Sequence, residues 1–276
     1  MNINRRKWAT RAAIGSVVLG GVYPFLEAKW LGVTRRTVRL RNLPAPFEGT
    51  TVAFLADVHH GPFVPRAYVR HVVATTNALG PDIIALGGDY THAGHRYIAP
   101  VHEDLAGLKA RLGRFAVLGN HDHWDGLVES IAGVERSGIT LLRNSGAWIE
   151  EGGARLRVAG VADLWTGRPD VARAVGDEAT GGDAVLLLSH NPDVAETLRD
   201  PRVGLMLSGH THGGQVVIPG YGAPRVPSRY GQKYLRGLVR GPSCPVYVTR
   251  GVGTITPPVR LFCRPEVVLL TLTGRA

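Results

Sequence analysis

Five short apolar runs in this chain each lead into a residue that can bind a metal ion. They are "TVAFLAD" at 51–57, "DIIALGGD" at 82–89, "FAVLGN" at 115–120, "AVLLLS" at 184–189 and "VGLMLSG" at 203–209. Each has the length and composition of a buried strand, whereas residues 68–79, 101–112 and 127–138 have helical spacing. Residues 147–161 predict a hairpin that turns at Gly152 and Gly153, and the C-terminal part adds further β structure. The pattern predicts an α/β fold with two sheets packed together.

The side chains that end these runs form a set suited to metal binding. Because ligand sites of open α/β sheets lie at the carboxyl ends of the strands, we expect these side chains to converge at one edge. Residues i and i+2 of an extended segment face the same way, so each D-x-H or H-x-H pair can aim at one place. Oxygen and nitrogen donors without a thiolate favour Mn²⁺, Fe²⁺ or Zn²⁺. The candidate ligands are Asp57, His59, Asp89, Asn120, His190, His210 and His212.

The ordered series "DVH", "GGD", "GNHD", "SH" and "GHTH" resembles the calcineurin-like metallophosphoesterases, over residues 50–272. The strings "FLADVHHGPFVP", "LGGDY", "SHNPD", "GHTHGGQ" and "TRGVGT" resemble a bacterial subgroup that often carries a twin-arginine-like N-terminus. The resemblance implies a four-layer α-β-β-α sandwich of two packed mixed sheets. It also implies two divalent metal ions, with Mn²⁺ expected first and Fe²⁺ or Zn²⁺ as alternatives.

The same resemblance implies a role for each candidate residue. Asp89 would bridge the two ions, and His121 would protonate the leaving oxygen, oriented by Asp122. The family's common G-D-x-x-D motif has His92 in place of its last Asp here, so no metal is assigned to that position. One ion would be held by Asp57, His59 and His212, and the other by Asn120, His190 and His210.

The implied activity is hydrolysis of a phosphodiester or pyrophosphate by a hydroxide that bridges the two ions. An alternative is a UDP-2,3-diacylglucosamine pyrophosphatase of lipid A synthesis, and an alternative of another class is a metal-binding scaffold without turnover. Metal ligands do not separate these substrates, which we expect the loops 90–104 and 219–243 to select.

The remaining histidines, tryptophans and cysteines receive simpler expectations. Trp124 and Trp165 are candidates for a substrate pocket, although buried packing is expected first. Cys244 and Cys263 are expected to be buried thiols, with a disulfide as the alternative in an exported protein. Six histidines are expected on the surface or in loops: His60, His71, His92, His95, His102 and His123. Of these, His60 and His123 are the candidates for the pocket.

The net charge of +10 is concentrated at the N-terminus. Residues 1–41 hold nine Lys or Arg residues against one acid, whereas residues 42–276 hold 23 against 21. Because the body is nearly neutral, a nucleic-acid partner is not expected. We therefore divide the chain into a basic and apolar targeting or membrane-anchor segment, 1–41, and a phosphoesterase domain, 42–276, which we expect to be monomeric.

Paired Arg5 and Arg6 before the apolar residues 12–26 resemble a twin-arginine export signal. The apolar run falls short of the roughly 20 residues that a spanning helix needs, and no clear cleavage site follows it. Removal and retention as an anchor both stay open, as does a helix that packs on the body. We expect an exported, membrane-associated enzyme with a phosphodiester or lipid-linked substrate, and the cytoplasmic face of the inner membrane is the alternative.

Overall fold

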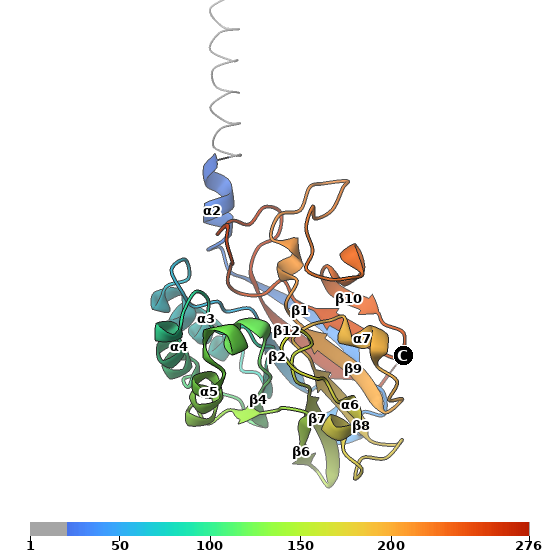
Figure 1. Cartoon of the computed structure of the whole chain (residues 1–276). Coiled ribbons are helices and arrows are strands. Elements are labelled where there is room, and N and C mark those ends of the chain that lie inside the picture. The colour runs from blue at the N-terminus through green and yellow to red at the C-terminus, as the bar shows by residue number, and fades with distance from the viewer. Residues whose placement is uncertain (1–20, 276) are drawn as a thin grey trace, which may run out of the picture.

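The computed structural model describes residues 21–275 of the chain (Figure 1). Arg5, Arg6 and the first part of the apolar stretch 12–26 lie outside these residues. Within them, helix α2 (Tyr23–Glu27) stands at one end of the body, and no helix is both long and apolar enough to cross a membrane.

The first sheet has six strands in the order β1-β12-β2-β3-β4-β5. Strands β2 to β5 run parallel, β12 is antiparallel to β2, and β1 adds a parallel edge strand beside β12. Strand β1 lies in the segment 1–41 that the sequence analysis assigned to targeting or anchoring. The bounds are β1 (Gly32–Arg39), β2 (Thr51–Leu55), β3 (Ile83–Leu86), β4 (Gly113–Ala116), β5 (Thr140–Leu141) and β12 (Glu266–Thr273).

The second sheet also has six strands, in the order β10-β11-β9-β8-β7-β6. Its four central strands are parallel and both edge strands are antiparallel, so this sheet is mixed like the first. The predicted hairpin is confirmed, with its turn at Gly152 and Gly153 between β6 and β7. The bounds are β6 (Ser145–Glu151), β7 (Ala154–Gly160), β8 (Ala184–Leu188), β9 (Val203–Ser208), β10 (Gly237–Arg240) and β11 (Pro245–Val248).

Helices cover the outer face of each sheet (Figure 1). Helices α3 (Arg66–Ala78), α4 (Ile98–Leu105) and α5 (Asn120–Arg136) pack on the first sheet. The short helices α6 (Val171–Val175) and α7 (Val194–Thr197) pack on the second. Four 3-10 turns complete the elements within residues 21–275: η2 (Ala45–Phe47), η3 (His95–Tyr97), η4 (His212–Gly214) and η5 (Gly231–Tyr234).

Alternation along β2 shows how the sequence builds these layers. Val52 and Phe54 point into the core between the two sheets, whereas Ala53 and Leu55 face the layer of helices. Successive side chains of a strand point to opposite faces, so a strand that is apolar throughout must be covered on both. The four-layer α-β-β-α sandwich of two mixed sheets is therefore confirmed.

Candidate metal centre

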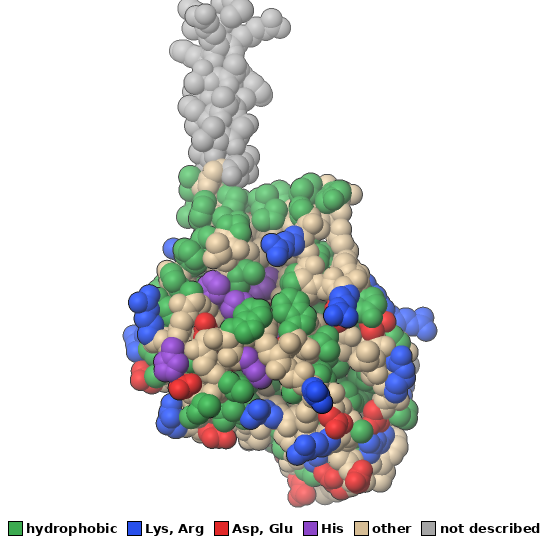
Figure 2. Space-filling model, in the orientation of Figure 1, with side chains coloured by type: hydrophobic (Ala, Val, Ile, Leu, Met, Phe, Trp, Pro, Cys, Tyr) green, Lys and Arg blue, Asp and Glu red, His purple; other side chains and the backbone are tan. Residues whose placement is uncertain are grey.

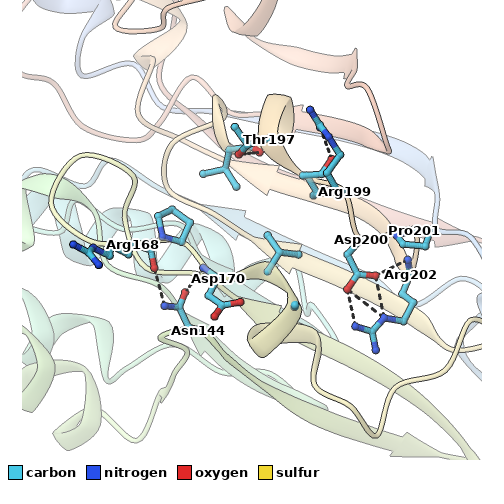
Figure 3. Close-up of a pocket in the computed structure, with 13 residues that line it drawn as sticks. Asn144, Arg168, Asp170, Thr197, Arg199, Asp200, Pro201 and Arg202 are labelled. Carbon is cyan, nitrogen blue, oxygen red and sulfur yellow. Dashed lines mark hydrogen bonds and ion pairs between the residues drawn. The ribbon is translucent and has the colours of Figure 1, made fainter.

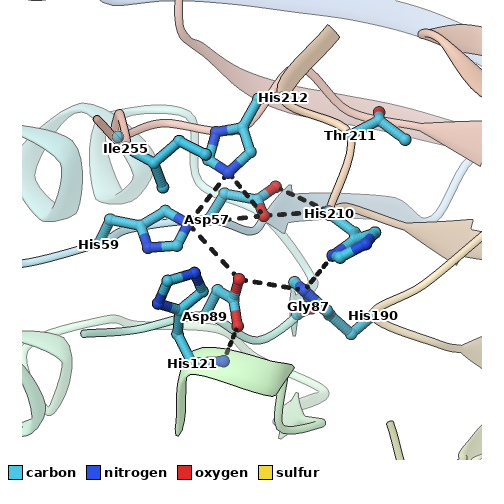
Figure 4. A network of polar contacts seen from close by, with 12 residues as sticks. Asp57, His59, Gly87, Asp89, His121, His190, His210, Thr211, His212 and Ile255 are labelled. Carbon is cyan, nitrogen blue, oxygen red and sulfur yellow. Dashed lines mark hydrogen bonds and ion pairs between the residues drawn. The ribbon is translucent and has the colours of Figure 1, made fainter. Parts of the chain in front are cut away.

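The loops after four strands bring six predicted ligands into one buried cluster (Figure 4). Strands β2 and β3 belong to the first sheet, and β8 and β9 to the second, so the cluster lies where the carboxyl ends of both sheets meet. The six are Asp57, His59 and Asp89 from the first sheet, with His190, His210 and His212 from the second.

The first group of donors consists of Asp57, His59 and His212. The Nε2 atoms of the two histidines lie 3.0 Å apart, and Asp57 Oδ1 lies 3.6 Å from His212 Nε2. The second group consists of Asp89, His190 and His210, in which His190 Nε2 lies 3.2 Å from both Asp89 Oδ2 and His210 Nδ1.

Asp89 faces both groups with one oxygen. Its Oδ2 lies 3.2 Å from His190 Nε2 and 3.5 Å from His59 Nε2, which belong to different groups. A carboxylate in this position can serve two cations at once. The buried clusters are therefore consistent with a dinuclear metal site.

The charges of the buried groups also fit cations. Burial lowers the pKa of His59 and His212 well below the ordinary value and lowers that of His210 to about 3, so these rings are neutral and keep a lone pair. Burial also opposes protonation of His190, but the Asp89 carboxylate outweighs it and raises the pKa of His190 to about 10, so a cation that binds this ring would have to displace its proton. A buried carboxylate such as Asp57 costs free energy unless a positive charge neutralises it.

Asn120 belongs to the first turn of α5, not to the end of a strand. Strand β4 ends at Ala116, Gly119 caps the helix, and Asn120 begins it. Asn120 Oδ1 is buried and has no hydrogen-bond partner among the described residues, although Asn120 lines the same cavity as Asp89 and His210. A buried carbonyl oxygen without a donor is costly, and a cation would satisfy it.

Asp122 has contacts other than those expected. Its carboxylate accepts hydrogen bonds from the backbone N–H groups of Gly119, Asp89 and Tyr90, each at 2.8 Å. These bonds tie the loop after β3 to the first turn of α5. Asp122 therefore positions the backbone of the site, whereas the sequence analysis expected it to orient the His121 ring.

The His121 side chain is half-buried at the edge of the cluster. Its ring centroid lies 4.8 Å from that of His59, and its Nδ1 lies 3.4 Å from Nδ1 of His92. The backbone N–H of His121 donates to Asp89 Oδ1 at 2.8 Å. His121 also lines the cavity, so its ring can reach a molecule bound beside the cluster.

The ligand loops are held in a costly backbone conformation. Five of the seven candidate ligands have φ between 49° and 69°, the left-handed region that side chains rarely adopt. Each such residue costs on the order of 1–3 kcal/mol and persists only where the surrounding structure imposes it.

The cluster is also too tight for a side chain at Gly209, where an added Cβ would lie 2.6 Å from Asp57 Oδ2. The glycine that opens "GHTHGG" therefore permits the close packing.

A cavity of about 380 Å³ opens beside the cluster. Trp124 and Trp165 line it and are 59% and 50% exposed, so the expectation of buried packing was wrong. The ring centroids of Trp165 and His210 lie 4.3 Å apart, and those of Trp124 and His121 lie 4.9 Å apart.

The loop 219–243 contributes to the lining of the cavity as expected, whereas no residue of the loop 90–104 lines it. Sequence reasoning missed the wall formed by Ile255, Thr256, Pro257 and Val259.

Residues 50–214 match the family described as calcineurin-like phosphoesterase. The chain belongs to this family. It is 35% identical to the phosphodiesterase YaeI of Escherichia coli over 277 residues, which cover 98% of this chain and 99% of YaeI. It is 31% identical to the metallophosphoesterase YkuE of Bacillus subtilis over 270 residues, which cover 94% of this chain and 93% of YkuE. It is also 32% identical to a metallophosphoesterase of Aquifex aeolicus, in a match that covers 94% of this chain and 98% of that relative.

A larger hollow, of about 700 Å³, lies away from the cluster of this metallophosphoesterase (Figure 3). Its polar groups already bind one another. Asn144 bonds to the backbone of Arg168 and Asp170, and Arg202 forms an ion pair with Asp200. These interactions hold the surrounding loops of the phosphoesterase together. The smaller cavity is therefore the candidate site.

Arg260 supports the loops of the metallophosphoesterase site, a role that sequence reasoning missed. Its side chain is fully buried, and its guanidinium donates to the carbonyl oxygens of Arg250 at 2.7 Å and Gly253 at 2.6 Å. The Gly253 N–H in turn donates to the Asp57 carbonyl oxygen at 2.7 Å. Arg260 also donates to the carbonyl oxygen of His212 at 3.3 Å, so it holds two ligand loops together.

Replacing Arg260 with Met should destabilise the phosphoesterase by roughly 2–4 kcal/mol, because several buried carbonyl groups lose their donor. Urea denaturation followed by circular dichroism measures this loss of unfolding free energy. The exposed Arg173, on α6, provides the control, and Arg173→Met should change stability by less than about 0.5 kcal/mol. Equal effects of the two substitutions would contradict the supporting role of Arg260.

The other predicted positions have mixed outcomes. His71 and His95 are exposed as expected, and His60 is buried but lies in the loop after β2, whereas His102 is buried in α4, so the expectation of a surface or loop position was wrong for His102. His60 Nδ1 bonds to the carbonyl oxygen of Val64 at 2.8 Å, and neither His60 nor the half-buried His123 is among the residues that line the cavity. The two thiols, Cys244 and Cys263, are both buried and unpaired, as predicted.

Proposed function

We propose that this metallophosphoesterase is a dinuclear phosphodiesterase that cleaves phosphodiester or pyrophosphate bonds. The observation that carries the proposal is the single oxygen of Asp89 that faces both donor groups. The phosphodiesterase activity of YaeI, a relative over nearly the whole chain, supports it. We propose Mn²⁺ as the working ion, with Fe²⁺ or Zn²⁺ as alternatives, because the donors are oxygen and nitrogen.

The proposed ligands divide between two ions, with Asp89 shared. When bound, the ions would activate water for attack on phosphorus and neutralise charge on the phosphoryl oxygens. Asp57, His59 and His212 would hold one ion, and Asn120, His190 and His210 the other.

His121 is the proposed acid of the reaction. It lines the cavity and borders His59, so a phosphoryl group held by the ligands would present its leaving oxygen near the His121 ring. Donation of a proton to that oxygen prevents the build-up of negative charge as the P–O bond breaks. Asp122 would act indirectly, through the backbone that it holds.

The cavity favours a substrate with an apolar or aromatic group beside its phosphate. Trp124 and Trp165 flank one side, and Ile255, Pro257 and Val259 line another. This lining supports a second candidate, a lipid-linked pyrophosphate such as UDP-2,3-diacylglucosamine.

We also propose that the enzyme is a monomer exported through its twin-arginine-like signal and associated with the membrane, with the cytoplasmic face of the inner membrane as the alternative. The support is the sequence of residues 1–41, with its paired arginines, apolar stretch and positive charge. Basic residues near an anionic leaflet contribute roughly 1 kcal/mol each.

Metal analysis tests the dinuclear proposal directly. After chelation, reloading with Mn²⁺ and removal of free metal, the protein should retain about two ions per chain. The same sample should hydrolyse bis(p-nitrophenyl) phosphate, and the chelated sample should not. One ion per chain at full activity would disprove a dinuclear mechanism, and full activity of thoroughly chelated protein would disprove metal dependence.

A further inference from the structure

Exposed hydrophobic side chains gather at the end of the body that carries α2 (Figure 2). They make up eight of the thirteen large hydrophobic side chains that are exposed within residues 21–275. Such a concentration marks an interaction surface, because single exposed hydrophobic residues are normally scattered. We call this set the α2 rim, and it consists of Val22, Phe25, Leu26, Trp30, Phe63, Ile218, Tyr221 and Phe262.

Hydrogen bonds join the segments of the α2 rim into one surface. The buried Glu27 carboxylate of α2 accepts from the backbone N–H of Phe262 at 3.0 Å. The neighbouring Leu261 bonds through its carbonyl oxygen to the N–H of Val217, which precedes Ile218. Residues from distant parts of the sequence are therefore fixed beside α2.

The α2 rim adjoins the candidate site. Phe25 and Phe63 line a cavity of about 410 Å³ together with Thr254 and Pro258. Other residues of this same segment, 255–257 and Val259, line the site cavity. The segment 254–259 therefore separates the α2 rim from the site, and Figure 2 shows histidine side chains next to the hydrophobic end.

The charge around the α2 rim is positive. Its segments, residues 21–31, 60–68, 215–243 and 254–265, contain one acidic residue, the buried Glu27. Their basic residues include the exposed Lys29, Arg236, which bonds to the Phe262 carbonyl oxygen at 3.0 Å, and Arg264, whose guanidinium lies 3.9 Å from the centre of the Trp30 ring.

We propose that the α2 rim docks on the surface of an anionic lipid bilayer. Val22, Phe25 and Leu26 belong both to the rim and to the apolar sequence 12–26, so the N-terminal segment leads directly into this surface. Aromatic and basic side chains together suit the boundary between lipid headgroups and acyl chains. A second copy of the chain fits less well, because a two-fold interface would place these basic residues against their own copies.

The inference deepens, and rests on, the proposed action of the enzyme at a membrane. Docking through the α2 rim would hold the site cavity close to the headgroups, where the phosphodiester of a membrane lipid can enter it.

Fluorescent labels on the full chain test the docking. An environment-sensitive nitrobenzoxadiazole label on an Ile218→Cys variant should brighten several-fold when phosphatidylglycerol vesicles are added. The same label on a Val128→Cys variant should not respond, because Val128 is 72% exposed on α5, outside the rim. Equal responses at both positions, or no response while the chain sediments with the vesicles, would refute docking by the rim. Brightening that depends on protein concentration without vesicles would indicate a second copy instead.

Charge substitutions separate docking from catalysis. The double variant Phe63→Glu and Ile218→Glu should bind vesicles roughly tenfold or more weakly as the full chain, because two apolar groups can no longer enter the interface. Val128→Glu should leave binding unchanged, and an equal loss in both variants would overturn the proposal. In buffer without vesicles, all these proteins should hydrolyse bis(p-nitrophenyl) phosphate equally. Inactivity of every protein there, the wild type included, would count against the proposed function and leave the binding comparison intact.

Discussion

Replacing Asp89 with Ala is expected to abolish turnover and metal binding together. Asp89 Oδ2 faces His59 and His190, so its loss removes a donor from both groups at once. The variant also leaves His121 N–H without its carboxylate acceptor. We expect kcat/KM on bis(p-nitrophenyl) phosphate to fall on the order of 10⁴-fold, as it does when a central group of a catalytic unit is removed. Steady-state kinetics and metal analysis of the same sample measure both effects.

The same strand offers a matched control. Asp82 precedes β3, whereas Asp89 follows it, so the two carboxylates lie toward opposite ends of one strand. Asp82 accepts from Thr51 and forms an ion pair with Arg111, away from the site. Asp82→Ala should therefore cost about 1 kcal/mol of stability and leave both ions and turnover in place. An Asp89→Ala variant that keeps two ions would disprove the bridging role.

Replacing His121 with Asn is expected to slow the chemical step while both ions stay bound. His121 borders the cluster, where its ring lies with those of His59 and His92, but it is not a member of the proposed ligand set. Loss of a general acid typically lowers kcat about 10²–10⁴-fold. The loss should be greatest for alkyl phosphodiesters and smaller for p-nitrophenyl esters, because nitrophenolate leaves without a proton. A series of substrates with leaving groups of different pKa measures this dependence.

His123 is the matched control for His121. It lies two residues further along α5 and is not among the residues that line the cavity. His123→Asn should retain activity and both ions. An equal loss for all leaving groups in the His121→Asn variant would contradict proton donation by His121, and loss of an ion would make His121 a ligand.

Local pattern was enough to predict the layers and the convergence of the ligand loops. Strand β2 is apolar from Val52 to Leu55, and Asp57 follows two residues later, so neighbouring residues indicate both the buried strand and its polar end. The start of α5 was less apparent. Helical spacing predicted residues 127–138, but the helix begins at Asn120 and is interrupted at Gly126, where φ is 151°. Helix capping by Gly119 and Asp122 decided that boundary.

Contacts between distant residues account for most of what the sequence did not predict. Asp122 binds backbone groups of residues 89 and 90, which no spacing within "GNHD" could indicate. Arg260 lies in an irregular segment without periodicity, and its carbonyl partners include Arg250 and Gly253 in one loop and His212 in another. Strand β1 pairs with β12 across more than two hundred residues. Tertiary structure alone brings these groups together.

The division of the ligands between the two sheets links cation binding to the cooperativity of folding. The donors proposed for each ion follow strands of both sheets: Asp57 and His59 with His212, and Asn120, in the helix after β4, with His190 and His210. Separating the sheets would therefore break both coordination shells, and unfolding must release the ions. Their binding free energy would add to the free energy of unfolding. The midpoint of thermal unfolding should accordingly rise with metal concentration, so that metal supply would set the stability of the folded enzyme as well as its rate of turnover.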